Sequence, residues 1–240
     1  MFYSSGSAAS RDIDERTPLG PGIRSAAREL AAVPDFSYVD RVREWRRLVG
    51  FRPVFSTRAL AAGTWSDFAQ LAEDHHGVWA GCWCLGFHEE GRNGIHTPEQ
   101  RRALKEARVR AGRAHAALVF DGAECVGWCQ FGSAEELPRI KHQKAYREGL
   151  RELPDWRITC FFVGRGHRHR GVADAALAGA LEQIAELGGG TVESYPEDTA
   201  GRKVSASFLN NGTLAMFERH GFTRGRQIGK HRWIVTRVLS

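Results

Sequence analysis

The spacing of apolar residues along the chain predicts a mixed sheet flanked by helices. Runs with the composition of strands lie at 53–60, 114–120, 125–131, 158–163, 191–195 and 233–238. Apolar residues at helical spacing occur in 65–73, 172–187 and 206–220. At the centre of this order of elements, residues 158–195 form a crossover in which a strand is followed by a turn, a helix and a second strand. The predicted fold class is therefore α/β (α+β).

Three other segments carry local signals of structure. Asp121-Gly122 between two apolar runs predicts a hairpin. Gly77–His88 is apolar and aromatic, which predicts a buried strand. Thr97 and Gln100 form a capping box around Pro98 and open a basic helix that reaches about Gly112.

The N-terminal residues differ in composition from the rest of the chain. Residues 1–22 are rich in Ser, Gly, Ala and Pro, and we expect them to be mobile. Two helices are predicted at 26–32 and 38–49. We therefore expect an N-terminal extension over 1–50 and one domain over 51–240, with an insertion around 132–157 that contains a basic helix near 141–151.

Composition narrows the classes of protein to consider. The chain has 240 residues, 42% of them hydrophobic and 26% charged, as in ordinary globular proteins. It contains no apolar run of the ~18 residues that a membrane span needs, and its start lacks the pattern of a secretory leader, so we expect a cytoplasmic protein. The net charge of +6 favours an anionic partner, either nucleic acid or a polyphosphate cofactor.

The turn after the strand at 158–163 has the chemistry of an anion site. It reads GRGHRHRGVA and runs directly into a helix, whose first N–H groups have no intrahelical partner and carry partial positive charge. Gly171 allows a phosphate to approach the backbone closely. Arg165, Arg168 and Arg170 add charged donors, whereas His167 and His169 are expected to be exposed loop residues.

The five cysteines are odd in number and lie mostly in apolar segments, so we predict reduced thiols and no disulfide framework. Cys82 and Cys84, with His75 and His76 upstream, suggest a metal site at first sight. On a strand, however, the two thiols would be ~6–7 Å apart, too far for one tetrahedral metal ion. We therefore expect buried thiols and no metal.

The hexapeptide Arg-His-Arg-Gly-Val-Ala at 168–173 resembles the Arg/Gln-x-x-Gly-x-Gly/Ala signature of the GNAT superfamily of N-acetyltransferases. Its context strengthens the resemblance, since it follows an apolar strand and opens a helix. The later segment Met-Phe-Glu-Arg-His-Gly-Phe, at 216–222, is similar to the closing helix of that family. The resemblance covers roughly 53–239 and is most specific over 158–222.

The resemblance implies a mostly antiparallel GNAT-like sheet, in which a central parallel strand pair, 158–163 and 191–195, splays around acetyl-CoA. It further implies direct acetyl transfer to the amine of a small molecule or peptide. The cofactor-binding residues that it implies are Phe161, Phe162, Val163, Arg168, His169, Arg170, Gly171, Val172, Ala173, Asn210 and Phe217.

Phe217 departs from the family pattern, which often has a tyrosine there that protonates the departing CoA thiolate. A phenyl ring has no proton to donate. Glu193 and Tyr195 are the candidate catalytic residues instead, because alternation along their strand places both on one face. Glu193 can equally be a structurally paired carboxylate, and Tyr195 can line the groove.

Two other functions stay open at this point. Because Phe217 lacks a hydroxyl, the chain can be a non-catalytic acyl-CoA-binding regulatory module. The arginine-rich helices near 97–112 and 140–152 allow a nucleic-acid-directed enzyme, such as a tRNA acetyltransferase, although a solvated helix face explains them as well. The extension and the insertion can shape the acceptor cleft or a homodimer interface.

Overall fold

The computed structural model describes residues 55–78, 80–92 and 97–240. Residues 53–240 form one compact unit. The expected start of the domain near residue 51 stays a prediction. The predicted extension, including its mobile segment and its two helices, lies outside the described residues.

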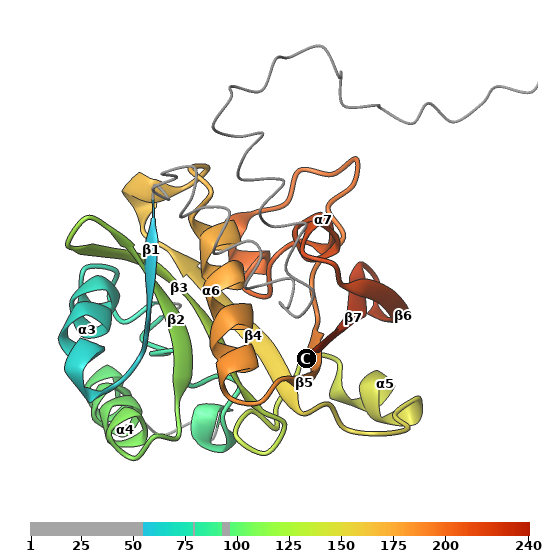
Figure 1. Cartoon of the computed structure of the whole chain (residues 1–240), viewed down its shortest axis with the longest axis horizontal. Helices are drawn as coiled ribbons and strands as arrows, with labels where there is room; N and C mark the ends of the chain where they lie inside the picture. Colours follow the sequence, from blue (N-terminus) through green and yellow to red (C-terminus); the bar gives the residue numbers. More distant parts are fainter. Residues whose placement is uncertain (1–54, 79, 93–96) are drawn as a thin grey trace, which may run out of the picture. The chain divides into compact units, whose positions relative to one another are not determined.

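A seven-stranded sheet forms the centre of the described unit, in the order β1-β2-β3-β4-β5-β7-β6 (Figure 1). All neighbouring strands are antiparallel except β4 and β5, which are parallel. The mixed, mostly antiparallel sheet with one parallel pair confirms the predicted fold class. The strands are β1 Ser56–Ala59, β2 His115–Asp121, β3 Glu124–Ser133, β4 Trp156–Val163, β5 Gly190–Ser194, β6 Thr223–Gly229 and β7 Arg232–Leu239.

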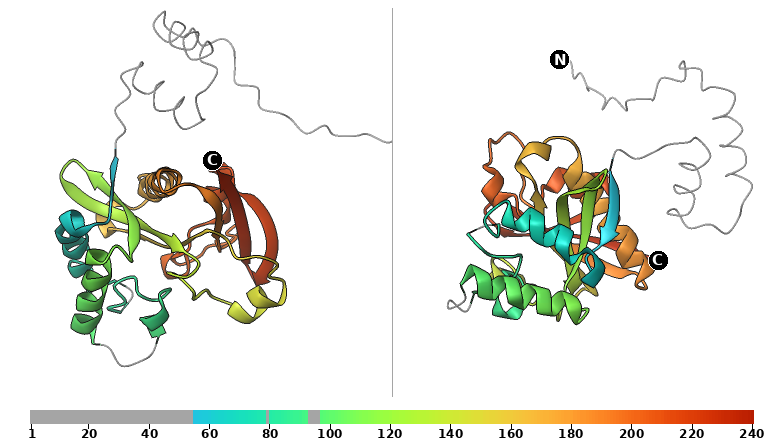
Figure 2. Two further views of the ribbon diagram at one scale, coloured as in Figure 1. Left: turned by 60° about the horizontal axis from the view of Figure 1, so that its bottom comes forward. Right: turned by 90° about the vertical axis from the view of Figure 1, so that its left-hand side faces the viewer.

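Helices cover both faces of the sheet (Figure 2). The α-helices are α3 Trp65–Glu73, α4 Pro98–Arg110, α5 Gln143–Glu148, α6 Val172–Glu186 and α7 Leu214–Arg219. The 3-10 helices are η1 Ala62–Thr64, η2 Glu89–Arg92, η3 Arg165–His167 and η4 Ala206–Phe208. Helix α4 begins as predicted, since the Thr97 side chain accepts from the Gln100 N–H and the Gln100 side chain accepts from the Thr97 N–H.

The two faces of the sheet pack into separate cores. On one face, Phe68 of α3 packs near Trp128 of β3, with ring centroids 4.6 Å apart, and Phe162 of β4 joins them. On the other face, α6 and α7 pack on β3, β4 and β7. Strand β3 is buried over eight consecutive residues because both of its faces are covered, and this explains its continuous apolar run.

Residues 77–78 and 80–88, the described part of the segment 77–88, are mostly buried, but they form a series of turns and not the predicted strand. Its N–H groups bond to nearby carbonyls, such as Cys82 N–H to Val78 C=O at 2.8 Å and Trp83 N–H to Gly77 C=O at 2.9 Å. Left-handed backbone recurs at non-glycine residues, including Trp83 and Cys84 with φ of 50° and 52°. Apolar content marked the burial correctly, but it does not distinguish a strand from a buried turn.

Strand β6 was not predicted from the sequence. It reads TRGRQIG, and most of its side chains are exposed or half-buried. Strand β6 is the last strand in the sheet order and pairs with β7 alone. An edge strand of this kind can carry polar side chains, so its sequence lacks the apolar alternation that marks a buried strand.

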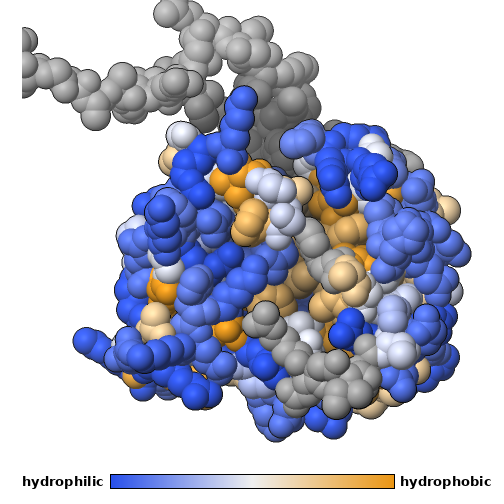
Figure 3. Space-filling model, turned by 180° about the vertical axis from the view of Figure 1, so that it is seen from behind, coloured by the Kyte–Doolittle hydropathy of each residue, from blue (hydrophilic) through white to orange (hydrophobic). Residues whose placement is uncertain are grey.

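The surface of the unit is mostly hydrophilic. On the face shown in Figure 3, hydrophobic residues gather towards the middle and hydrophilic residues surround them. Among the described helices, none is both long enough and apolar enough to cross a membrane.

Candidate functional site

The parallel strands β4 and β5 separate after a short ladder. Their pairing runs from Trp156 opposite Val192 to Ile158 opposite Ser194. Strand β4 continues to Val163 while pairing with β3 alone, and its register with β3 shifts between the pairs at Cys160 and Ile158. The edge of β4 that faces away from β3 therefore lacks a partner strand beyond Ile158, as the predicted splay requires.

The loop before α7 fills the first part of the gap between β4 and β5 beyond Ile158. The Asn210 C=O accepts from the Phe161 N–H at 2.7 Å, and the Asn211 Nδ2 donates to the Thr159 C=O at 2.7 Å. The Gly164 N–H bonds to Val126 on the β3 side, so strand alternation directs the Val163 N–H towards the opening. A notch with free strand edge thus remains near Val163.

The N-terminus of α6 lies beside this notch. Gly171 is its N-cap, with φ of 85°, and its C=O accepts from the Ala175 N–H at 3.0 Å in the first turn of the helix. No described atom lies within 4 Å of where a Gly171 Cβ would stand. The amides of Val172 and Ala173 are consequently not covered by a capping side chain, and they carry the positive end of the helix dipole.

A second glycine brings α6 close to the sheet. A Cβ on Gly127 of β3 would lie 2.7 Å from both the Phe162 carbonyl oxygen and the Val172 Cγ1. Only a glycine lets the first turn of α6 rest against β3 and β4 at this distance. The N-terminal end of α6 and the free edge of β4 are held side by side for this reason.

A cavity of about 310 Å³ joins the notch to the helix N-terminus. It is formed by β4, the turn after it, the start of α6 and the loop that leads into α7. Its lining residues include eight of the predicted cofactor-binding residues, namely Phe161, Phe162, Val163, Arg168, His169, Gly171, Val172 and Ala173.

The other three predicted cofactor residues lie outside the lining of this cavity. Arg170 is half-exposed and pairs with Asp121 at 3.1 Å. Phe217 is fully buried, with its ring 5.9 Å from Phe161 and 4.9 Å from Phe222. Asn210 lines a second cavity, although its carbonyl holds the Phe161 N–H.

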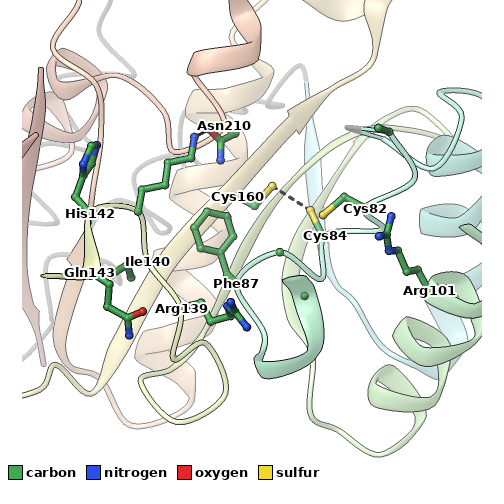
Figure 4. Close-up of a pocket in the computed structure, with 14 residues that line it drawn as sticks. Cys82, Cys84, Phe87, Arg101, Arg139, Ile140, His142, Gln143, Cys160 and Asn210 are labelled. Carbon is green, nitrogen blue, oxygen red and sulfur yellow. Dashed lines mark hydrogen bonds between the residues drawn. The ribbon is translucent and has the colours of Figure 1, made fainter. Parts of the chain in front are cut away.

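The second cavity, of about 900 Å³, is enclosed by turns and loops that are far apart in the sequence (Figure 4). Cys84 and Phe87 come from the segment 77–88, Cys160 from β4, and Arg139–Gln143 from the insertion. The cationic residues in its lining are Arg101, Arg139 and Lys141, with His142 beside them, and no Asp or Glu is found among its described lining residues. Apart from the insertion, which was expected to shape either a cleft or a dimer interface, no sequence signal pointed to this cavity, because its walls come from separate parts of the chain.

Cys84 and Cys160 meet at the wall of the larger cavity, with their Sγ atoms 3.0 Å apart. The Trp128 Nε1–H donates to the Cys84 Sγ at 3.1 Å. Lys105 is fully buried in the same layer, where its Nζ donates to the Gln130 Oε1 at 3.0 Å. The interpretation of the 97–112 helix as a solvated basic face missed Lys105.

Glu193 and Tyr195 share one face of their strand as predicted, since the Tyr195 hydroxyl donates to the Glu193 Oε1 at 2.5 Å. Burial, followed by the Glu193 charge, raises the pKa of Tyr195 well above its ordinary value. Both residues are buried, and neither lines either cavity. Tyr146 packs edge-on against Tyr195 and accepts from Arg157 at 3.2 Å. A structural role is therefore evident, and their catalytic role stays a prediction.

The arginines of α4 are largely neutralised by carboxylates. Arg102 pairs with Glu73 at 2.8 Å and with Glu106 at 3.1 Å, and Arg110 pairs with Glu106 at 2.7 Å. These contacts favour the interpretation of α4 as a solvated face. Within the described ranges, no group of three or more His, Cys, Asp or Glu residues is placed to hold a metal ion.

The sequence matches no protein-family model and no curated protein. Solved structures similar to it include an acetyltransferase from Thermus thermophilus, 15% identical over 78% of this chain and 98% of that one, with a TM-score of 0.44. Another is yncA from Salmonella typhimurium with its cofactor acetyl-CoA, 14% identical over 78% of this chain and 95% of that one, with a TM-score of 0.44. A third is an acetyltransferase of the GNAT family from Streptococcus pneumoniae, 12% identical over 77% and 99%, with a TM-score of 0.43. GNAT-family acetyltransferases are thus among the solved structures that this chain resembles.

Proposed function

We propose that the chain is an acetyl-CoA-dependent N-acetyltransferase that transfers acetyl directly to an amine. The observation that carries this proposal is the single cavity shared by the free edge of β4 and the uncapped N-terminus of α6. A strand edge suits the amides of a pantetheine arm, and a helix N-terminus suits a diphosphate.

The chain's own groups fit such a cosubstrate. Gly171 leaves the amides of Val172 and Ala173 open to phosphate oxygens, and Arg168 is placed in the same lining to add a charged donor. The Val163 N–H is directed to the notch, where an amide carbonyl can accept from it. Acetyl-CoA, when bound, supplies a thioester carbonyl that is activated toward amines.

The larger cavity is the proposed acceptor site, because it adjoins β4 through Cys160 and Asn210. Two sites that meet at one strand hold the amine and the thioester in a fixed relation, and positioning of this kind can supply much of the catalysis. Phe217 is buried and has no hydroxyl, so proton transfer to the departing thiolate is not assigned to it.

The charge of this cavity indicates the class of acceptor. The Nη1 of Arg101 donates to the Gly81 C=O at 3.4 Å, and the Nη1 of Arg139 donates to the Glu89 C=O at 2.9 Å. These partners are neutral, unlike the carboxylate partners of Arg102, Arg108 and Arg110 on α4. A guanidinium bonded only to a carbonyl keeps its positive charge available to a ligand. We therefore propose an amine acceptor that also carries a carboxylate or phosphate group.

Calorimetric titration of the full chain with acetyl-CoA tests the cosubstrate. We expect saturable binding at micromolar concentration, and the absence of any heat of binding would reject the proposal. Acetyl transfer is then measured on pairs of an amino acid and its carboxamide, which differ in one negative charge.

The carboxamide has the less basic amine and therefore more free base at neutral pH, so it reacts faster unless the enzyme recognises the carboxylate. We expect the amino acids to react faster. Equal or reversed rates would reject the anionic acceptor while leaving acetyl transfer intact. Binding of acetyl-CoA without transfer to any amine of a broad panel would instead support the acyl-CoA-binding module.

A further inference from the structure

Two cysteines that are distant in the sequence meet at the wall of the larger cavity. Cys84 belongs to the series of turns within 77–88, called the turn segment below, and Cys160 belongs to β4. Their Sγ atoms are 3.0 Å apart. Their residues are only 2% and 3% exposed, but both line the cavity, which gives small molecules a route to them (Figure 4).

The surroundings of the two thiols are unequal. Burial opposes ionisation of Cys84, but the hydrogen bond with Cys160, the charge of Lys105 and the Trp128 N–H together lower its pKa. The same hydrogen bond, together with burial, raises the pKa of Cys160 well above its ordinary value. Cys84 is therefore the more readily ionised of the two thiols, and a hydrogen bond joins the two sulfurs.

Lys105 has neutral hydrogen-bond partners in this layer. Its Nζ donates to the Gln130 amide and lies 3.4 Å from the Nε2 of His88. Burial, followed by the Lys105 charge, lowers the pKa of His88 to about 2, so this imidazole is neutral. Burial likewise lowers the pKa of Lys105, whereas a Cys84 thiolate favours its charged form. The charge of Lys105 thus favours ionisation of Cys84, and an ionised Cys84 favours the charged form of Lys105.

The separation of the sulfur atoms is short enough for a bond after a small movement. A disulfide requires about 2 Å between the sulfurs, so an approach of about 1 Å closes the pair. Trp83 and Cys84 both adopt left-handed backbone, which is rare for residues with side chains. This conformation is what directs the Cys84 side chain towards β4, and unusual backbone of this kind concentrates at functional positions.

We propose that Cys84 and Cys160 are an oxidisable thiol pair, in which Cys84 is oxidised by hydroperoxides and Cys160 completes a disulfide. The Cys84 thiolate attacks one oxygen of hydrogen peroxide, the O–O bond breaks, and hydroxide leaves and takes a proton to become water. The Cys160 sulfur then attacks the resulting sulfenic acid, the S–S bond forms, and the second oxygen leaves as water. Two thiols are oxidised and one peroxide is reduced, with a thiol reductant reversing the reaction.

Cys82 offers a matched control. It lines the same cavity and is more exposed than Cys84, but burial and the neighbouring Cys84 raise its pKa. If access alone governed oxidation, Cys82 would react first. If the thiolate environment governs it, Cys84 reacts first.

The experiment treats the reduced full chain with substoichiometric hydrogen peroxide in the absence of acetyl-CoA, so its outcome is independent of the proposed acetyl transfer. Intact mass and peptide mapping follow the products. We expect a loss of about 2 Da and a cross-link between the peptides of Cys84 and Cys160, both reversed by dithiothreitol. The Cys82→Ser variant should behave alike, and it removes the ambiguity of two cysteines in one tryptic peptide.

The Cys160→Ser variant should instead accumulate a sulfenic acid at Cys84 that dimedone traps, because the resolving thiol is missing. First oxidation at Cys82, Cys125 or Cys129, or cross-links mainly between molecules, would overturn the proposal. The proposal would also be overturned if Cys84 and Cys160 of the wild-type chain stayed reduced under conditions in which hydrogen peroxide oxidises a free thiol added to the same solution.

Discussion

The two cavities on either side of β4 are built in different ways. Much of the smaller one is made by groups that are close in sequence, since the edge of β4, the turn after it and the first turn of α6 are consecutive along the chain, and residues 206–219 complete it. The larger one is assembled from the turn segment, the start of α4, the insertion and the loop before α7. The smaller cavity includes a strand edge and a helix N-terminus, whereas the larger is lined by side chains that include three cationic residues and three cysteines.

This difference indicates how each site achieves selectivity. Backbone amides at a strand edge and a helix N-terminus recognise the repeating polar groups of a cosubstrate, and glycines protect them from obstruction. Side chains from separate loops can vary independently, so they suit the recognition of one particular acceptor. Substitutions should therefore separate cosubstrate binding from acceptor recognition.

The largest effect is expected from Gly171→Trp. An indole there covers the first amides of α6, and the residue must also adopt a backbone with φ of 85°. We expect acetyl-CoA affinity to fall at least about 100-fold, measured by calorimetry.

Gly188→Trp is the matched control for this change. Gly188 follows the other end of α6, has φ of 107° and likewise has no described atom within 4 Å of a Cβ. Backbone strain is therefore similar, but the amides of the cavity stay open. If both variants lose affinity equally, blockage of the amides is not the cause.

The second-largest expected effect is a loss of stability at acid pH that arises from His88, which is fully buried. Its folded pKa, about 2, lies below the ordinary value of 6.5, so the unfolded chain takes up a proton over this window and the folded chain does not. The free energy of unfolding should fall by about 2 kcal/mol between pH 7 and pH 5 from this residue alone. Urea titrations at both pH values measure it.

His88→Gln keeps an acceptor for Lys105 but does not titrate. We expect the variant to lose about that part of the pH dependence, even if it is less stable at pH 7. An unchanged difference between pH 7 and pH 5 would show that His88 is not the group responsible.

The third effect is on acceptor recognition alone. Arg139→Gln removes a guanidinium from the larger cavity, and a charged hydrogen bond of this kind contributes ~1.5–3 kcal/mol. We expect KM for an anionic amine to rise at least about tenfold, with acetyl-CoA affinity unchanged.

Arg139→Lys, which keeps the charge, should recover part of the loss, and KM for a neutral amine should not change in either variant. A parallel loss of acetyl-CoA affinity would show that the two cavities do not act as separate sites.

The smallest effect separates two arginines of the anion-binding turn. Arg168 lines the smaller cavity, whereas Arg170 is half-exposed and pairs with Asp121. Because exposed ion pairs contribute little, Arg170→Gln should weaken acetyl-CoA binding no more than about twofold. Arg168→Gln should weaken it more, by about threefold to tenfold, in calorimetry at low ionic strength. The reverse order would mean that Arg170 leaves Asp121 to bind the phosphates.

The elements that the sequence predicted well are those with strong local signals. Helix α3 has the predicted bounds because Phe68 and Leu71 mark its buried side, and α4 begins at its capping box. The β2–β3 hairpin follows from Asp121-Gly122. The turn segment around Cys84 was mistaken for a strand, since its left-handed residues leave no trace in apolar content.

The sequence by itself determined the central crossover and the glycine-bearing basic turn within it, because a strand, a turn and a helix are local and consecutive. Only the tertiary structure decided the larger cavity, which we propose as the acceptor site. Contacts such as Cys84 with Cys160, 76 positions apart, and Lys105 with Gln130 depend on how α4 and the turn segment pack on the sheet. That packing is set by the burial of many side chains together, and no single stretch of sequence encodes it.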